Sequence, residues 1–429
     1  MPEAGLLLLT LAFLLVIRVP VAFAIGIATV LVLGQSLPLD VTLTTTAQRL
    51  ATSLDSFTLL AIPLFILAGE LMGRGGIAER LINLARAALA SLPKGLAHVH
   101  ILASMLFGSL SGSAVAAASA VGGVMGPRMQ REGYSAGSAA AVNISSATTG
   151  LLIPPSNVLI IYSLASGGVS ITALFVAGYV PGLLLGLALA VAVQLSLPGP
   201  VAQAPSGPRL GRAFLQALPS LGLPLLVMGG IVAGIFTPTE ASAIAVLYAG
   251  ALSLAYRRLR FADFPSVFAD AAITTGTVAL LIATSMALSW LLAFERIPQS
   301  LAEGLMAGIE NPLALLLAIN FVLLVVGTFM DMTPAILIFA PIFVPIAVGM
   351  GIDPVHFGVM MVLNLSIGLC TPPVGTVLFV GCGVAGTSLG EVIRPLLPMY
   401  LAMLGALALV ATIPALSLGL PRFLGYLGP

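Results

Sequence analysis

Apolar segments long enough to cross a lipid bilayer follow one another along almost the whole chain, with short connections between them. A bilayer core about 30 Å thick needs roughly 20 apolar residues in a helix. Such segments occur at about 57–73, 95–126, 135–165, 171–196, 218–235, 240–256, 270–294, 312–350, 358–380 and 396–418. Only 7% of the 429 residues are charged, whereas about 25% are charged in an average soluble domain. The sequence therefore predicts an all-α polytopic membrane protein.

The composition also excludes several kinds of function. A formal net charge of +1 does not provide the clustered basic face that nucleic-acid binding needs. Two cysteines, Cys370 and Cys382, are too few for a disulfide framework or a structural zinc site, so we expect both in the core. Three histidines leave little room for metal or general-base chemistry. We expect no nucleic-acid partner, no metal other than a coupling ion and no enzymatic activity.

The N-terminal segment lacks the positive start and the small-residue cleavage site of a secretory signal. We interpret residues 1–56 as one or more membrane segments and a connection. Arg18 and Pro20 interrupt the apolar run Gly5–Gly34 near its middle. This run is compatible with one kinked crossing or with two shorter pieces.

Basic residues lie in alternate connections, and positive charge marks the cytoplasmic side of a membrane protein. The basic groups are Arg74, Arg80, Arg86 and Lys94; Arg128 and Arg131; Arg209 and Arg212; and Arg257, Arg258 and Arg260. The segment at about 95–126 has such a connection on each side, so its two ends lie on the same face. Its roughly thirty residues must therefore enter the membrane and return to the same face. A helix rises about 1.5 Å per residue, so each arm reaches only part of the way across. We predict a re-entrant helical hairpin with its tip at Gly108–Ser113.

The same landmarks return about 220 residues later. The matching pairs are Gly108 and Gly327, Ser113 and Thr333, Asn143 and Asn364, and Pro154 and Pro372. The loops around the second hairpin, at about 312–350, contain one basic residue, Arg296, and the acids Glu295, Glu303, Glu310 and Asp353. The second hairpin is therefore expected to enter from the opposite face. Inverted repeats with discontinuous helices are a common plan of secondary transporters.

The expected organisation follows from these landmarks. In chain order it comprises N-terminal segments (1–56), a first repeat (57–196), a linker (197–216), scaffold helices (217–269), a second repeat (270–395) and a C-terminal membrane helix (396–429). The amphipathic stretch Ile77–Leu92 is expected to be an in-plane scaffold helix. Glu240 is expected to complete a capping box at a helix start.

Each repeat breaks its helical pattern twice, at the hairpin tip and inside a crossing helix near Pro154 or Pro372. Proline frees the carbonyl one turn earlier, and freed carbonyls and hydroxyls are hard oxygen ligands suited to Na⁺. Half-helix N-termini suit an anionic substrate group. Asp331 is the one acid within either hairpin, and it is either a functional residue or a half-helix cap. Asn143 and Asn364 are either ligands or helix-packing clamps.

Five stretches of the chain resemble a known family. They are GSLSGSAVA (108–116), NISSATTGLLIPPSNVLIIYS (143–163), FTPTEASA (236–243), MDMTPAILIFAPIFVP (330–345) and NLSIGLCTPPVGTVLFV (364–380). They are similar to the large membrane subunit of tripartite ATP-independent periplasmic (TRAP) transporters, over essentially the whole chain. The resemblance implies an elevator-type fold of the ion-transporter superfamily and sodium-driven import of a small organic acid across the bacterial inner membrane. It also implies two partners, a small four-helix membrane (Q) subunit on a separate chain and a periplasmic substrate-binding (P) protein.

The resemblance also implies site residues. One sodium site would comprise Ser109, Ser111, Ser113, Asn143, Thr149 and Pro154, and the other Gly327, Asp331, Thr333, Asn364 and Thr371. The substrate would lie between the tips, against Ser113, Asn143, Thr333 and Asn364. Ala117 stands where many members have an acidic or hydroxyl residue, so the resemblance does not transfer a substrate preference.

Two other functions are compatible with parts of the pattern. A sodium/dicarboxylate symporter or ion exchanger would share the hairpins and act without a binding protein. An intramembrane serine hydrolase would use the run Gly108–Gly112, but it needs a base within reach of the serine. His98 and His100 precede the tip by two to three turns and His356 lies in the other half, so neither place suits a base.

Overall fold

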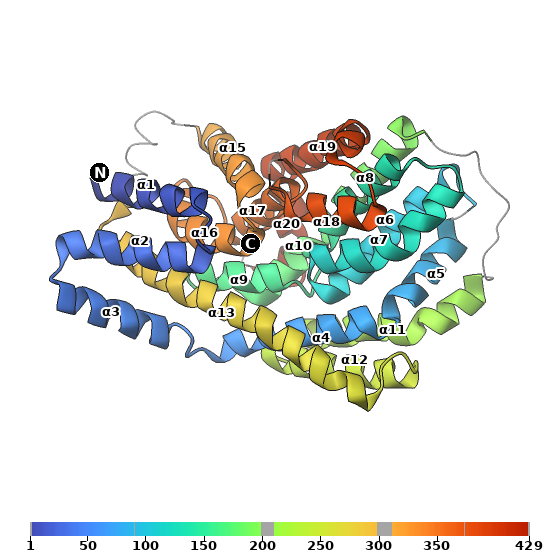
Figure 1. Cartoon of the computed structure of the whole chain (residues 1–429), viewed down its shortest axis with the longest axis horizontal. Coiled ribbons are helices and arrows are strands. Elements are labelled where there is room, and N and C mark those ends of the chain that lie inside the picture. The colour runs from blue at the N-terminus through green and yellow to red at the C-terminus, as the bar shows by residue number, and fades with distance from the viewer. Residues whose placement is uncertain (1, 90, 199–209, 298–310, 373, 428–429) are drawn as a thin grey trace.

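The computed structural model describes residues 2–89, 91–198, 210–297, 311–372 and 374–427, and these residues form helices and turns without a β-strand. The N-terminal run forms two short helices, α1 (Pro2–Val16) and α2 (Val21–Ser36), which fold back on each other (Figure 1). The chain turns at Arg18 and Pro20, because proline lacks the N–H that would continue the α-helix. Of the two expected arrangements, the structure has the two shorter pieces.

A first group of helices includes the long helix α13 (Phe264–Phe294), which packs against α2, α3 and α4 (Figure 1). Its other members are α3 (Leu39–Thr52), η1 (Phe57–Leu60), α4 (Ala61–Arg74), α5 (Ile77–Leu89), α11 (Leu210–Val232), α12 (Pro238–Ala255) and η3 (Phe261–Asp263). Helix α5 is the expected amphipathic helix; it bends 66° away from α4 and buries its apolar face. We call this group the scaffold group.

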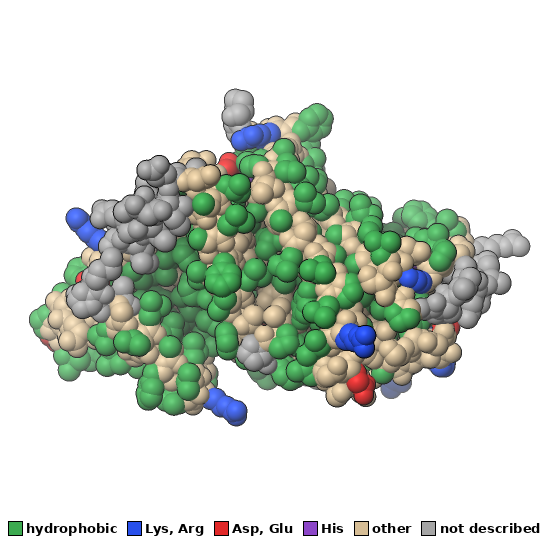
Figure 2. All heavy atoms as spheres, turned by 90° about the horizontal axis from the view of Figure 1, so that it is seen from above, with side chains coloured by type: hydrophobic (Ala, Val, Ile, Leu, Met, Phe, Trp, Pro, Cys, Tyr) green, Lys and Arg blue, Asp and Glu red, His purple; other side chains and the backbone are tan. Residues whose placement is uncertain are grey.

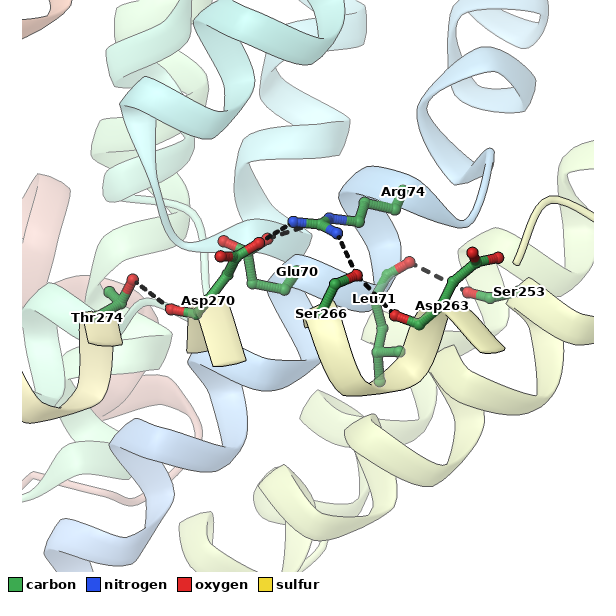
Figure 3. A network of polar contacts seen from close by, with 8 residues as sticks. All are labelled: Glu70, Leu71, Arg74, Ser253, Asp263, Ser266, Asp270 and Thr274. Carbon is green, nitrogen blue, oxygen red and sulfur yellow. Dashed lines mark hydrogen bonds and ion pairs between the residues drawn. The ribbon is translucent and has the colours of Figure 1, made fainter. Parts of the chain in front are cut away.

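Polar contacts fasten the scaffold group at one end. Arg74 on α4 pairs with Asp270 on α13 and donates to Ser266 Oγ at 3.1 Å, as Figure 3 shows. Ser253 on α12 donates to the Leu71 carbonyl at 3.1 Å. The capping box predicted at Glu240 is confirmed: Thr237 and Glu240 cap the start of α12 reciprocally.

A second group of helices contains both hairpins, and we call it the hairpin group. Its first half comprises α6 (Gly95–Ser111), α7 (Ala114–Arg131), α8 (Ala136–Ala147), η2 (Thr148–Leu151), α9 (Asn157–Ala165) and α10 (Ile171–Ser196). Its second half comprises α15 (Pro312–Phe329), α16 (Met332–Gly349), α17 (Pro354–Gly368), α18 (Thr376–Ala385), α19 (Leu389–Thr412) and the short α20 (Ala415–Phe423). The halves interlock, since α7 packs on α18 and α9 on α16.

Glycine pairs dock the hairpins on the broken helices in both halves. A Cβ on Gly108 would lie 2.7 Å from Gly150 Cα, and a Cβ on Gly368 would lie 2.6 Å from Gly327 Cα. Backbones can approach this closely only where neither residue has a side chain. The expected repeat thus recurs in three dimensions as the same contact.

Six described helices are long and apolar enough to cross a membrane, or seven if α4 and α5 form one bent span. Figure 2 shows a face covered mainly by hydrophobic side chains, with few charged ones. Helix α11 begins at Leu210, within the range expected for the linker, and residues 199–209 of that linker lie outside the described residues. Arg209, Glu303 and Glu310, used above for sidedness, also lie outside them. Both cysteines are buried and unpaired, as expected.

Candidate functional site

Four helix starts from the two halves meet at one cavity of about 220 Å³. Two are the second arms of the hairpins, where Ser113 precedes α7 and Asp331 precedes α16. The other two follow the breaks in the crossing helices, where Asn157 begins α9 and Thr376 begins α18. All four residues line the cavity, together with Gly112 and Thr333.

The scaffold group supplies the opposite wall of this cavity. Ile62 and Ile66 on α4 and Val278 on α13 are apolar, and Thr274 on α13 adds one hydroxyl. Ile62 and Ile66 are four residues apart, as are Thr274 and Val278, so each of these two pairs lies on one face of its helix. The cavity therefore lies between the two groups, with polar groups on the hairpin side and a mainly apolar wall on the scaffold side.

The first tip is a tight turn. Gly112 has φ 61°, in the left-handed region that favours glycine, and a Cβ on it would lie 3.3 Å from the Asn157 nitrogen. Ser113 Oγ accepts from the Ala116 N–H at 3.2 Å and so caps α7. Ser111 Oγ lies 3.5 Å from the Ser113 nitrogen, and Ser109 Oγ donates to the Leu106 carbonyl at 2.9 Å. Of the three serines, Ser113 lines the cavity.

The second tip places a carboxylate where the first has a hydroxyl. Asp331 caps α16 by accepting from the Met332 N–H at 2.7 Å. A carboxylate has about four acceptor positions, so one bond leaves most of them available to the cavity. Of the described residues that line the cavity, Asp331 alone is charged. The tip is tied to the second broken helix, because the Val374 N–H donates to the Thr328 carbonyl at 3.1 Å.

Four other predicted residues, Thr149, Pro154, Gly327 and Thr371, lie outside the cavity lining. Thr149 Oγ1 donates to the Ser146 carbonyl at 2.6 Å and Thr371 Oγ1 to the Ile367 carbonyl at 2.8 Å, so both hydroxyls bond within their own segments. Pro154 is buried, and Gly327 packs against Gly368. None of these four lines the cavity.

Asn143 clamps the first hairpin to α8. Its Oδ1 lies 3.1 Å from His100 Nε2 on α6, and its Nδ2 donates to the Ala118 carbonyl on α7 at 3.0 Å. The amide thereby holds both hairpin arms, and it does not line the cavity. This geometry is that of a helix-packing clamp, which is one of the two roles that the sequence suggested for Asn143.

Asn364 makes the corresponding contact in the second half. Its Nδ2 donates to the Asn320 carbonyl at 2.8 Å and to Asn320 Oδ1 at 2.7 Å, and Asn320 stands at the repeat position of His100. Asn364 Oδ1 is buried and has no partner among the described residues. Of the four predicted substrate residues, therefore, Ser113 and Thr333 line the cavity, whereas Asn143 and Asn364 lie outside its lining.

Three polar side chains in the cavity lining, Asn157, Thr274 and Thr376, were missed by the sequence prediction. Asn157 and Thr376 begin the half-helices that follow the two breaks, and the Thr376 hydroxyl oxygen is buried without a partner among the described residues. The repeat offset of about 220 residues relates them and was the signal that identified the other pairs. Thr274 carries no such signal, because it comes from the scaffold group.

The tripartite ATP-independent periplasmic transporter family, DctM component, matches residues 8–416 of this chain. The chain belongs to this family. The C4-dicarboxylate TRAP transporter large permease protein DctM of Pseudomonas aeruginosa is 43% identical over 88% of this chain and 90% of its own length. The isethionate TRAP transporter permease protein DctMQ of Oleidesulfovibrio alaskensis is 38% identical over 95% of this chain and 64% of its own length.

The fold is also that of a solved transporter. The crystal structure of the Alcanivorax borkumensis YdaH transporter matches 88% of this chain and 90% of its own, with a TM-score of 0.66 and 17% identity. The resemblance found in the sequence is thus confirmed, and this DctM family member is a multi-pass protein of the inner membrane. The named relatives are transporter permeases rather than hydrolases. His100 bonds Asn143 and His98 bonds Gln194, whereas the histidine that does bond a serine, His356, bonds Ser417, far from the first tip in the sequence.

Proposed function

We propose that this protein is the large permease of a sodium-coupled, binding-protein-dependent importer of small organic acids. The observation that supports this most is the convergence of four helix starts on one cavity between two groups of helices. Each helix N-terminus has partial positive charge and free N–H groups, which favour an anion. Hydroxyl and amide groups of Ser113, Asn157, Thr333 and Thr376 add donors to the same cavity.

Sodium is the proposed coupling ion. The single charged side chain in the described lining, Asp331, would repel a carboxylate unless a cation accompanies it. Na⁺ prefers the oxygen ligands that the tips and breaks provide. The proposed sites keep the predicted residues near the tips, with Ser109, Ser111, Ser113, Thr149 and Pro154 in one and Gly327, Asp331, Thr333 and Thr371 in the other. In this proposal Asn143 and Asn364 position the hairpins that carry these sites.

Transport is proposed to follow an elevator motion of the hairpin group along the scaffold group. The hairpin group is tied together by the glycine pairs and the asparagine clamps. The facing wall on α4 and α13 is mainly apolar, with Ile62, Ile66 and Val278. Such a wall makes no directional bonds that sliding would have to break.

Two protein partners complete the proposal. The family is described as tripartite and periplasmic, which supports a periplasmic binding protein and a further membrane subunit. The relative named DctMQ is longer than the part that matches this chain. The relative from Pseudomonas aeruginosa, which is named a large permease protein, matches over 90% of its own length, and by analogy with it we propose that the small membrane subunit is a separate polypeptide here.

Uptake by reconstituted proteoliposomes tests the proposal, with radiolabelled succinate and isethionate as probes. We expect accumulation only with an inward sodium gradient, the small subunit and the cognate binding protein together. Equal uptake without the binding protein would favour the binding-protein-independent symporter. Uptake that is unchanged when potassium replaces sodium would exclude sodium coupling.

A further inference from the structure

The basic residues in the loops around the first hairpin differ in whether they have partners. Four of them bond to described groups: Arg74 pairs with Asp270, Arg80 donates to the Gly76 carbonyl, Lys94 to the Gln194 carbonyl and Arg131 to the Pro127 carbonyl. The other two, Arg86 and Arg128, form no ion pair with a described residue. Arg86 Nε and Arg128 Nη1 are buried, and neither nitrogen has a hydrogen-bond partner among the described residues.

These two arginines lie at one junction of helices. Arg86 is in the last turn of α5 and Arg128 in the last turn of α7, and α5 packs against both hairpin arms, α6 and α7 (Figure 1). Burial lowers the pKa of Arg128, and the positive charge of Arg86 lowers it further, so the two guanidinium groups lie close enough to repel each other. The carboxylate of Glu79 raises the pKa of Arg128, but Glu79 is already paired with Arg258.

Two like charges with buried, unpartnered nitrogens call for a counter-ion. A buried N–H without an acceptor costs free energy, and the cost is larger on a charged group. A buried charge without a partner is strongly destabilising. One anion between α5 and α7 would supply acceptors to both guanidinium groups and would remove their repulsion. A phosphate group suits this position, because guanidinium groups bind it through parallel hydrogen bonds.

The position of the junction indicates where the phosphate comes from. The loops that contain both arginines are expected at the cytoplasmic face, where anionic lipids attract basic segments. Basic pockets between membrane helices on this side bind the headgroups of such lipids.

We propose that Arg86 and Arg128 bind the phosphate group of an anionic phospholipid between α5 and α7. Neither arginine is among the described residues that line the tip cavity, so this is a second anion site. Because α5 belongs to the scaffold group and α7 to the hairpin group, the bound lipid contacts both groups. A soluble phosphate offers the same chemistry, and the experiment below separates the two sources.

The competing explanation is that the arginines only complement helix dipoles. A cation in the last turn of a helix is favourable there, and water would then complete its hydrogen bonds. The two explanations predict opposite effects in delipidated protein. If an anion is the missing partner, Arg128→Gln removes an uncompensated charge and should unfold at or above the wild-type temperature. If Arg128 only complements the dipole of α7, this variant should unfold at a lower temperature, by the same amount with and without lipid.

The experiment measures the unfolding temperature of the delipidated full-length protein in dodecyl maltoside during titration with dioleoylphosphatidylglycerol, dioleoylphosphatidylcholine or inorganic phosphate. We expect phosphatidylglycerol to stabilise the wild type more than phosphatidylcholine, which has no net charge. Arg86→Gln and Arg128→Gln should each weaken the apparent affinity for phosphatidylglycerol about tenfold, as the loss of one charge-assisted hydrogen bond predicts. Arg128→Lys should keep part of that affinity. Arg394→Gln is the matched control, because it removes the same charge from an exposed side chain on α19.

Three results would overturn the inference. They are equal stabilisation of the wild type by the two lipids, a lower unfolding temperature of Arg128→Gln that is the same with and without phosphatidylglycerol, and an equal loss of affinity in Arg394→Gln. Stabilisation by inorganic phosphate that is lost in both glutamine variants would support the phosphate site and assign it to a soluble anion. No transport is measured, so a failure of the proposed function would leave this inference standing.

Discussion

Gly108 and Gly150 lie so close that a Cβ on Gly150 would fall 2.2 Å from Gly108 Cα. The contact joins the tip of the first hairpin to the break in the first crossing helix, and Gly327 and Gly368 repeat it in the other half. A hairpin that ends inside a protein must satisfy its backbone there. The two glycine pairs therefore decide where each tip stands relative to the helix starts that line the cavity.

Substitution of these glycines should destabilise the protein. We expect Gly150→Ala to cost about 1–3 kcal/mol, as overpacking does, and Gly327→Ala to cost less, because its Cβ would lie 3.2 Å from Gly368 Cα. Gly123→Ala in α7 is the control, since its Cβ meets nothing within 4 Å. Thermal unfolding in detergent measures the differences, and equal values for Gly150→Ala and Gly123→Ala would contradict the account.

The Asn143 clamp depends on His100. We expect His100→Ala to destabilise the fold by about 1–3 kcal/mol, because it leaves the buried Asn143 Oδ1 without its partner. His98→Ala should have little effect, since His98 bonds Gln194 in an exposed contact. Thermal unfolding again provides the measurement, and sodium dependence of uptake provides the second readout. A His100→Ala protein with wild-type stability and altered sodium dependence would instead favour Asn143 as a ligand.

Asp331 caps α16 and is also a proposed sodium ligand. The substitution Asp331→Asn separates these two roles. Asparagine caps helices about as well as aspartate, so stability should change by less than about 0.5 kcal/mol. Loss of the charge should weaken the sodium dependence of uptake by about tenfold or more. The control is Asp353→Asn, because Asp353 caps α17 through the Val355 N–H at 2.8 Å and lies outside the tip cavity. Wild-type sodium dependence in Asp331→Asn would leave this residue as a cap only.

Thr376 should contribute to substrate binding without contributing to stability. Its hydroxyl has no partner among the described residues, so Thr376→Val should be neutral or stabilising. The loss of one donor to the anion should raise the KM for uptake by about threefold to tenfold. Thr29→Val is the comparison, because the Thr29 hydroxyl donates to the Ile25 carbonyl in its own helix and Thr29 does not line the cavity. Equal KM values for wild type and Thr376→Val would exclude this hydroxyl from the site.

Hydropathy and local chemistry were sufficient to predict the helical membrane fold and the helix breaks at Gly112–Ser113 and at Met330–Asp331. These predictions depend on residues that are neighbours in the sequence: the length of each apolar segment, the glycine before Ser113 and the acid at Asp331. They can therefore be made from the sequence alone. The repeat offset then paired Ser113 with Thr333, and both line the cavity. The same local rules predicted the capping box at Glu240.

Tertiary structure alone decided what the buried polar residues contact. Asn143 meets partners 25 and 43 residues away, and Asn364 meets one 44 residues away, so nothing adjacent to either asparagine distinguishes a clamp from a ligand. Thr274 reaches the cavity from a helix outside the hairpin group. Arg18 appears in the sequence as an interruption of an apolar run, and the structure shows that the chain folds back there, so that α2 packs against α1 and α13. Sequence determines which residues are costly to bury, whereas packing determines which partners they find.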